Sequence, residues 1–260
     1  MTGRLSVCWW SGIRDSCSTW ASPSESQLAK FARFSANPYQ QKFLAVLDEM
    51  DRQIGRLVDE IDRMGLAENT LLVVTSDNGP TAWPRYYSEG VYPPGSTAGY
   101  RGRKWSLYEG GIRIPLIARW KGRIAPGQVD STTILGSVDF FPTFCAMAGV
   151  APPPGVEFDG ENLSQALLGE PAQRSRPLLW EYGRDETFLK PGLASDQSPN
   201  LAIRDGRWKL LVNADGSRME LYDFESATDE RENVAARHPD VARRLSSRLL
   251  EWRKSLPVLE

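Results

Sequence analysis

Residues 70–79 read TLLVVTSDNG, a short apolar run that ends abruptly in a polar turn. β-Branched residues favour strands, and an apolar run without alternation is typical of a strand covered on both faces. In open α/β sheets, ligands bind beyond the carboxyl ends of the strands. The segment therefore predicts a buried strand that presents Asp77 and Asn78 at its end.

A helix is expected before this strand. Asn37 and Pro38 are typical of an N-cap and a first helical position, and Gly65 is a typical helix stop. Apolar residues between them recur at alternating spacings of four and three, which places them on one helical face. A helix lying on a core and followed by a buried strand indicates an α/β layer with parallel strands.

Further elements follow along the chain. Residues 81–100 have the composition of a loop, with many Pro and Gly, while residues 151–155 (APPPG) mark a boundary or rigid connection. The dipeptides at 205–206 and 215–216 are Asp-Gly hairpin signals. The remaining predicted elements are a buried strand at 112–120, a helix at 137–148, short strands at 178–182, 201–204, 208–212 and 219–223, and a terminal helix at 239–256.

Composition excludes several classes of protein. The 260 residues carry 31 Lys+Arg and 33 Asp+Glu, and this balance argues against a nucleic-acid partner. No apolar run is long enough for a membrane span. Three cysteines do not form a disulfide framework, and His238 is the one imidazole available to a zinc site or a Ser-His-Asp triad.

Two segments carry residues suited to chemistry. Asp77 and Asn78 offer adjacent oxygen ligands of the kind that Ca²⁺ and Mg²⁺ prefer, although an Asx turn at the strand end would need the same residues. Residues 102–111 read GRKWSLYEGG, in which the Lys104 ammonium is a compact charge for an anionic oxygen. The alternative for that segment is a solvated basic loop followed by a turn.

Taken in order, these motifs resemble the C-terminal part of the sulfatase family. The resemblance rests on MDRQIG at 50–55, VTSDNG at 74–79, Gly-x-Lys at 102–104, YEGGIRIP at 108–115, SVDFFPT at 137–143, IRDGRWKL at 203–210 and ELYD at 220–223.

The resemblance implies an α/β fold of the alkaline-phosphatase type, present in part. We expect residues 37–158 to form the C-terminal part of the α/β domain, a mixed sheet flanked by helices. Residues 159–260 would form a small antiparallel sheet with a terminal helix. Residues 1–36 match nothing in the family and are expected to be disordered or mis-framed.

The resemblance also implies a reaction. Sulfatases hydrolyse sulfate esters with a formylglycine made from Cys or Ser and a divalent cation, usually Ca²⁺. Asp77 and Asn78 would be two metal ligands, and Lys104 would contact the sulfate and its bridging oxygen. Metal and ammonium would both neutralise charge on the transferring group. Glu109 would shape the loop rather than touch the substrate, an aryl or carbohydrate sulfate.

The sequence departs from the family at the nucleophile. The family motif is Cys/Ser-x-Pro-x-Arg, but only Pro177 and Pro257 follow a serine two positions earlier, and neither has Arg two positions later. The early paired aspartates and the active-site histidines also find no match. We expect a C-terminal portion, from a truncated gene model or a frame change near residue 20. Such a chain would bind Ca²⁺ weakly, have little activity alone and expose apolar strand edges.

Other functions remain open at this point. A non-catalytic descendant that binds sulfated glycans or a partner would explain the absent nucleophile. A phosphoryl-transfer relative on the same fold would typically need several His and Asp ligands, and this chain has one His. Residues 1–20 are a poor match to a secretory leader. Aromatic residues of the 81–100 loop either stack on a substrate ring or pack the loop: Trp83, Tyr86, Tyr87 and Tyr92.

Overall fold

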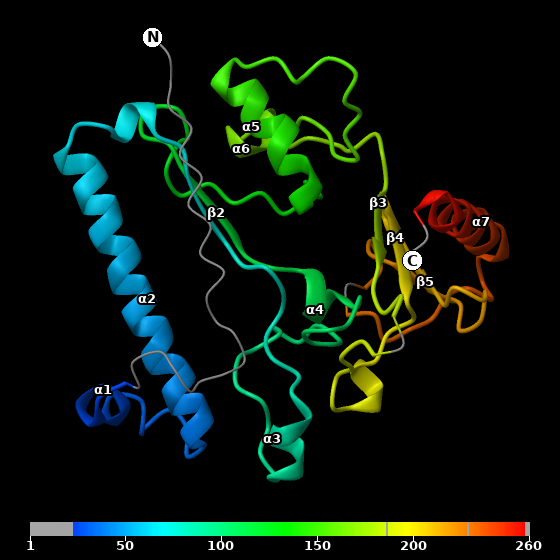
Figure 1. The fold of residues 1–260 in the computed structure, drawn as a ribbon, viewed down its shortest axis with the longest axis horizontal. Coiled ribbons are helices and arrows are strands. Elements are labelled where there is room, and N and C mark those ends of the chain that lie inside the picture. The colour runs from blue at the N-terminus through cyan, green and yellow to red at the C-terminus, as the bar shows by residue number, and fades with distance from the viewer. Residues whose placement is uncertain (1–22, 186, 228, 258–260) are drawn as a thin grey trace.

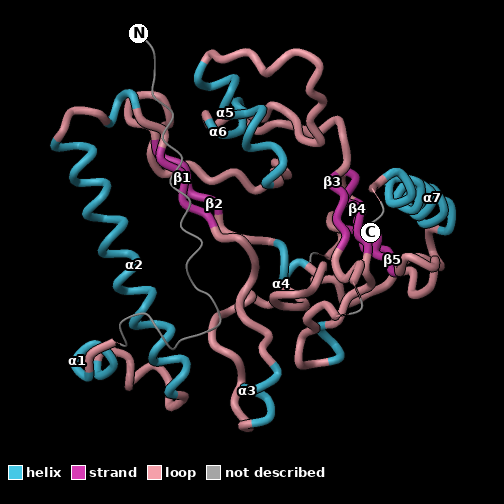
Figure 2. The backbone as a smooth tube through the Cα atoms, in the orientation of Figure 1, coloured by secondary structure: helices cyan, strands magenta, loops and turns pink. Residues whose placement is uncertain are grey.

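The computed structural model describes residues 23–257, apart from 186 and 228 (Figure 1). Of residues 1–36, expected from the sequence to be disordered or mis-framed, residues 1–22 lie outside this part of the chain, and residues 23–36 are described and include a short helix. Within it, the strands form two antiparallel sheets, one of two strands and one of four. Figure 2 shows the sheets standing apart, with loops and the short helix α4 (Glu109–Ile112) between them.

The predicted long helix is confirmed as α2 (Pro38–Arg63). The Asn37 side chain caps it by accepting a hydrogen bond from the Tyr39 amide at 2.9 Å. Gly65, with a φ of 69°, follows its end. The shorter α1 (Glu25–Ala29) precedes it.

The apolar face of α2 is less covered than expected. Ala45 is its one buried residue. Leu57 and Met64, which belong to the predicted core face, are 48% and 57% exposed. The periodicity predicts the helix correctly, but the described residues supply little for its second half to pack against.

The first sheet corrects the prediction of buried parallel strands. β1 (Leu72–Thr75) and β2 (Leu116–Arg119) pair antiparallel, with Thr75 opposite Leu116. Neither strand is buried, and Ile117 is 63% exposed. The intervening 40 residues leave and rejoin the ribbon at the same end, so β2 must run back along β1. A two-stranded ribbon cannot cover its own faces, and no mixed sheet forms among the described residues.

The long connection between β1 and β2 is mostly loop. It holds α3 (Pro84–Ser88) and α4. β2 starts later than the predicted strand at 112–120 because the Ile112 amide donates to Tyr108 O at 3.3 Å, in a helical turn. All the proposed site residues lie in this connection.

A helical layer follows β2. The predicted helix at 137–148 is confirmed as η2 (Ser137–Asp139) continuing into α5 (Phe140–Ala148), and α6 (Ser164–Leu167) lies close to it. Buried Asp139 forms an ion pair with Arg174, and this pair ties the start of the layer to the chain before the second sheet.

The second sheet confirms the predicted C-terminal half to within one residue at each boundary. Its strands lie in chain order and are all antiparallel. η3 (Ala194–Asp196) lies between its first two strands. The other elements are β3 (Leu178–Glu181), β4 (Leu201–Asp205), β5 (Trp208–Val212), β6 (Glu220–Asp223) and the terminal helix α7 (Pro239–Ser255).

Both hairpin signals are also confirmed. Asp205 pairs with Trp208, so a two-residue loop joins β4 to β5, and Gly206 takes a φ of 55°. Gly216 lies between β5 and β6 with a φ of 84°. A positive φ is readily accepted by Gly, which is why these turns form where the sequence predicts them.

Figure 1 shows α7 beside this sheet, and the main core lies between them. Its buried members are Leu201, Ile203, Leu210, Val212, Leu221, Val234, Ala242, Leu245 and Leu249.

The opposite face of the sheet packs against Leu107 and Tyr108. The C-terminal sheet therefore lies directly behind the segment that carries Lys104. No helix in the described part of the chain is long and apolar enough to cross a bilayer.

Candidate functional site

Two backbone hydrogen bonds join the motif segments that are distant in sequence. The Lys104 amide donates to Pro80 O at 2.9 Å, and the Gly79 amide donates to Gly111 O at 2.8 Å. A Cβ on Gly79 would lie 1.9 Å from Gly110 O, so this approach requires glycine. The polar end of β1 thus lies against the loop that contains Lys104.

Asp77 and Asn78 form a turn at the end of β1. Ser76 Oγ donates to Asn78 O at 3.0 Å, and Asn78 Nδ2 donates to Gly79 O at 2.8 Å. Asp77 is exposed and Asn78 is half-buried. The turn therefore leaves the Asp77 carboxylate at the protein surface.

Asp77 and Asn78 have the ligand atoms that a divalent cation prefers, but two residues are too few to complete its coordination. Carboxylate and amide oxygens suit Ca²⁺, which takes six to eight oxygen ligands. Among the residues that the structure describes, no group of three or more His, Cys, Asp or Glu side chains could hold a metal ion. Asp77 and Asn78 therefore provide part of a coordination shell.

Lys104 lies at the corner of a β-turn. The Ser106 amide donates to Arg103 O at 3.1 Å, which leaves Lys104 and Trp105 as the two central residues. Lys104 is half-buried. The backbone of Lys104 is therefore held in place by the turn and by the hydrogen bond to Pro80 O.

The alternative prediction of a solvated basic loop is wrong for Arg103. Its side chain is buried, with 2% exposed. Its guanidinium donates to Thr81 O and Pro94 O, both at 2.7 Å, and lies over the Tyr92 ring with 5.1 Å to the centroid. The two basic residues therefore differ in role. Arg103 holds the loop through its buried hydrogen bonds, whereas Lys104 is a central residue of the turn.

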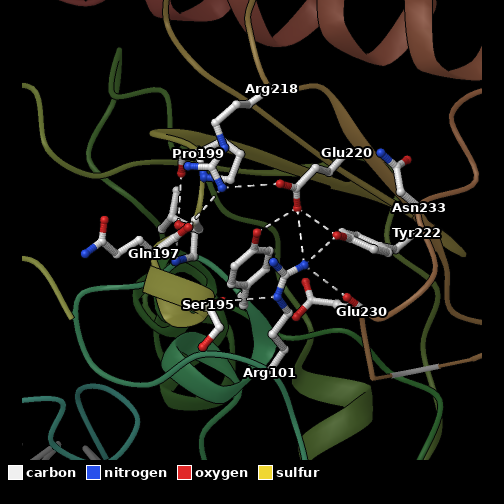
Figure 3. Close-up of polar contacts among 12 residues, drawn as sticks. Arg101, Ser195, Gln197, Pro199, Arg218, Glu220, Tyr222, Glu230 and Asn233 are labelled. Atoms are coloured by element: carbon white, nitrogen blue, oxygen red, sulfur yellow. Dashed lines mark hydrogen bonds and ion pairs between the residues drawn. The ribbon is translucent and has the colours of Figure 1, made fainter. Parts of the chain in front are cut away.

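A polar network joins Arg101 and Tyr108, on the two sides of this turn, to the C-terminal sheet (Figure 3). Glu220 Oε2 accepts hydrogen bonds from the hydroxyls of Tyr108 and Tyr222, both at 2.7 Å. The Arg101 guanidinium donates to Tyr222 Oη at 2.9 Å and lies 3.8 Å from the centre of the Tyr108 ring. Burial, reinforced by Glu220, raises the pKa of both tyrosines.

A buried charge cluster fixes the segment after the turn. Lys209, on β5, is fully buried, and its Nζ lies 2.7 Å from Glu109 Oε1 and from Glu230 Oε1. The Glu109 amide donates to Glu230 Oε2 at 2.5 Å. The expected loop-shaping role of Glu109 is consistent with this arrangement, since its carboxylate binds Lys209.

The two carboxyl groups differ in their titration. Burial alone would raise the pKa of Glu109, but Lys209, together with Arg204 and Arg113, outweighs burial and holds that pKa below its usual value. Burial raises the pKa of Glu230, against the opposing effect of Lys209. The sequence offers one signal for this cluster, a lysine inside the apolar strand WKLLV at 208–212.

His238 takes no part in this region. It stands at the N-terminal cap of α7, and its ring centroid lies 4.9 Å from that of Trp208. The sequence places it correctly at a helix start.

Comparisons with known proteins agree with the motifs. The Sulfatase family model matches residues 15–150, and the model of N-sulphoglucosamine sulphohydrolase, C-terminal, matches residues 99–255. The chain belongs to the sulfatase family. This sulfatase chain spans less than half the length of the relatives and the solved structure described next.

The names of its relatives refer to different sulfate esters. N-acetylgalactosamine-6-O-sulfatase of Bacteroides thetaiotaomicron is 30% identical over 224 residues, which cover 78% of this chain and 40% of that protein. Arylsulfatase G of Mus musculus is 39% identical over 164 residues, 58% of this chain and 31% of that protein. The crystal structure of Ps i-CgsB with a neocarrahexaose has a TM-score of 0.71 at 23% identity, covering 88% of this chain and 46% of that one. It supports the fold.

Proposed function

We propose that this chain carries the lysine and part of the metal-binding side of a sulfatase active site for aryl or carbohydrate sulfates. Lys104 contacts the sulfate, and Asp77 and Asn78 are two ligands of a divalent cation, Ca²⁺ by family resemblance. The observation that carries the proposal is the 2.9 Å hydrogen bond from the Lys104 amide to Pro80 O. It joins the two segments whose residues must meet at one anion.

In this proposal, the protein holds a charge where the reaction needs one. The Lys104 ammonium binds a sulfate oxygen and offsets negative charge that develops on the leaving ester oxygen. A bound cation would supply further electrostatic stabilisation of the sulfate. Buried Arg103 and Glu109 keep the turn fixed on both sides, so the ammonium needs little reorganisation during the reaction.

The division of the chain is part of the proposal. Residues 37–158 carry the ligand-binding groups, and residues 159–260 brace them through Lys209 and Glu220. The 260-residue chain has no Cys/Ser-x-Pro-x-Arg segment. We therefore expect little or no turnover by this chain alone.

The missing motif also favours a second candidate, a non-catalytic protein that binds sulfated glycans. It shares the anion-binding residues with the first candidate and differs in having no catalytic partner segment. Both candidates predict sulfate binding, so binding is the property to measure first.

The test is calorimetry of the purified chain with methyl sulfate, in the presence and absence of Ca²⁺. We expect Lys104→Met to weaken methyl sulfate binding at least about tenfold, a loss of about 1.4 kcal/mol. Asp77→Asn should remove any dependence of binding on Ca²⁺. Exposed Lys42 provides the matched control, Lys42→Met. Equal binding by the Lys104 and Lys42 variants would contradict the proposed site.

Activity is measured separately with 4-nitrophenyl sulfate. Turnover above background by the purified chain would contradict the expectation of an incomplete catalytic site. Binding without turnover, lost in Lys104→Met, is the expected result.

A further inference from the structure

Trp105 has a backbone conformation that its side chain disfavours. It is the third residue of the 103–106 turn and has a φ of 72°. A turn with a positive φ at this position demands Gly or Asn, and a bulky residue there is an outlier. Strain of this kind costs on the order of 1–3 kcal/mol and persists where the surroundings hold it in place.

The neighbours of Trp105 provide that restraint. Arg103 is fixed by its buried guanidinium, and buried Ser106 accepts a hydrogen bond from the Tyr108 amide at 3.3 Å. A glycine would satisfy the same turn without strain. The stability of the loop therefore does not explain why a tryptophan occupies this position.

The Trp105 ring lies against Trp83, which caps the start of α3. Their centroids are 5.4 Å apart and the rings are tilted by 54°. Both residues are half-buried, so part of the pair remains open to solvent. Trp105 follows Lys104 directly in the chain.

The three tyrosines of the loop pack against other tyrosines. Tyr86 packs edge-on against Tyr39, with centroids 5.0 Å apart, and Tyr87 packs edge-on against Tyr92 at 6.3 Å. Those tyrosines hold the loop to α2 and to itself. Tyr92 also lies against the buried guanidinium of Arg103. Of the four aromatics considered from the sequence, Trp83 is the one whose ring packs against Trp105.

We infer that Trp83 and Trp105 form a stacking platform for a six-membered ring that bears the sulfate bound by Lys104. The inference rests on the proposed function of Lys104 and names the specificity-determining residues of that site. Indole faces bind ring C–H groups and aromatic rings, while one charged group fixes the orientation of the ligand. The strained position puts an indole directly after Lys104 in the turn, where a glycine could offer no ring contact.

The experiment is calorimetry of the full chain with three probes. Methyl sulfate has no ring, 4-nitrophenyl sulfate carries an aryl ring, and galactose 6-sulfate carries a pyranose. We expect at least one ring-bearing probe to bind about tenfold more tightly than methyl sulfate. The ring-bearing probe that binds more tightly shows whether the site prefers an aryl ring or a pyranose.

Trp105→Gly separates binding from structure. It should reduce the preference for the ring-bearing probe to less than about threefold and leave methyl sulfate binding unchanged. Because glycine relieves the strain, the melting temperature should stay the same or rise by about 2–4 °C. A purely structural role predicts a lower melting temperature and an equal loss for all probes.

A matched control removes an aromatic pair elsewhere. Phe140 and Phe144 in α5 also have centroids 5.4 Å apart, and Phe144→Leu should leave the ring preference intact. An unchanged preference in Trp105→Gly would overturn the platform while the Lys104 site stands. If Lys104→Met leaves methyl sulfate binding unchanged, the proposed function fails instead, and absence of binding by the unmodified chain overturns both.

Discussion

Lys209 is a buried cation held between two carboxyl groups. Its ammonium is fully buried between Glu109 and Glu230. Removing one member of a buried ion pair leaves an uncompensated charge, which is more costly than losing the attraction itself. Truncation of Lys209 would therefore leave two carboxyl groups without their shared buried cation.

We predict that Lys209→Met lowers the free energy of unfolding by about 3–5 kcal/mol. The measurement is urea denaturation near neutral pH, followed by circular dichroism. The control is Lys42→Met on the exposed side of α2, which should change stability by no more than about 0.5 kcal/mol. Similar losses in the two variants would show that the buried cluster contributes little.

The buried tyrosines predict how stability changes in alkali. The folded-state pKa of Tyr108 and of Tyr222 lies well above 10.0, because burial and Glu220 disfavour the phenolate. For a raised pKa, the stabilising contribution is complete below the unfolded value and declines as pH rises above it. We therefore expect stability to fall above about pH 10, as the unfolded chain ionises.

Absorbance at 295 nm across an alkaline titration checks this prediction. Two phenols should ionise only together with loss of near-ultraviolet circular dichroism, and Tyr222→Phe should remove one of them. Ionisation of every tyrosine in the folded chain would contradict the assigned burial.

Single residues also show what the sequence can and cannot predict. Asn37 caps α2 and Gly206 turns a hairpin as expected, because both effects act within a few residues. The partners of Lys209 are 100 and 21 positions away in the chain, and no local pattern joins them. The buried role of Arg103 is missed for the same reason.

At the scale of elements, the close approach of β1 to the Lys104 loop depends on glycine. Gly79 has a negative or extended φ, which other residues also adopt. An added methyl group would therefore be opposed by a steric clash and not by the backbone conformation. The obstructing atom is the backbone oxygen of Gly110, which cannot move aside as a side chain would. The two segments must separate if a Cβ is inserted.

We predict that Gly79→Ala lowers stability by about 1–3 kcal/mol, the usual effect of forcing atoms into a packed site. Gly55→Ala is the matched control, since a Cβ on Gly55 meets nothing within 4 Å. That change lies inside α2 and should stabilise the chain by up to about 1 kcal/mol. Chemical denaturation of both variants decides the matter; stabilisation by Gly79→Ala would contradict the close approach.

The second sheet and the first sheet differ in how well the sequence predicts them. β4 and β5 are joined by a two-residue hairpin, so local turn chemistry sets their direction. β1 and β2 are separated by 40 residues, and nothing local sets their pairing. Their apolar character predicts strands correctly but does not reveal which neighbours cover them.

For the whole molecule, the consequence of the open β1–β2 ribbon is a tendency to associate. Leu116 and Ile117 are exposed on β2, and each strand has an unpaired edge among the described residues. Exposed apolar edge strands template pairing with other chains. The second half of α2 adds further exposed apolar surface nearby (Figure 1).

We predict that the purified chain self-associates at micromolar concentrations and that Ile117→Lys reduces this association. Sedimentation velocity over a concentration series provides the measurement. Val129 is 90% exposed in a loop, so Val129→Lys adds the same charge away from the ribbon and should leave association unchanged. Equal effects of the two substitutions would indicate that net charge, and not the ribbon, controls association.

The long sequence separation of the buried ion cluster also sets an order of events during synthesis. Glu109 is translated 100 residues before Lys209 and 121 before Glu230. At about 5–20 residues per second, the nascent segment around Lys104 waits roughly 5–20 s for its cationic anchor. Until then the Glu109 carboxylate favours water over burial, so the segment around Glu109 should be among the last parts to reach its final form. A ribosome that stops before codon 209 would release a chain in which Glu109 lacks Lys209 as its buried partner.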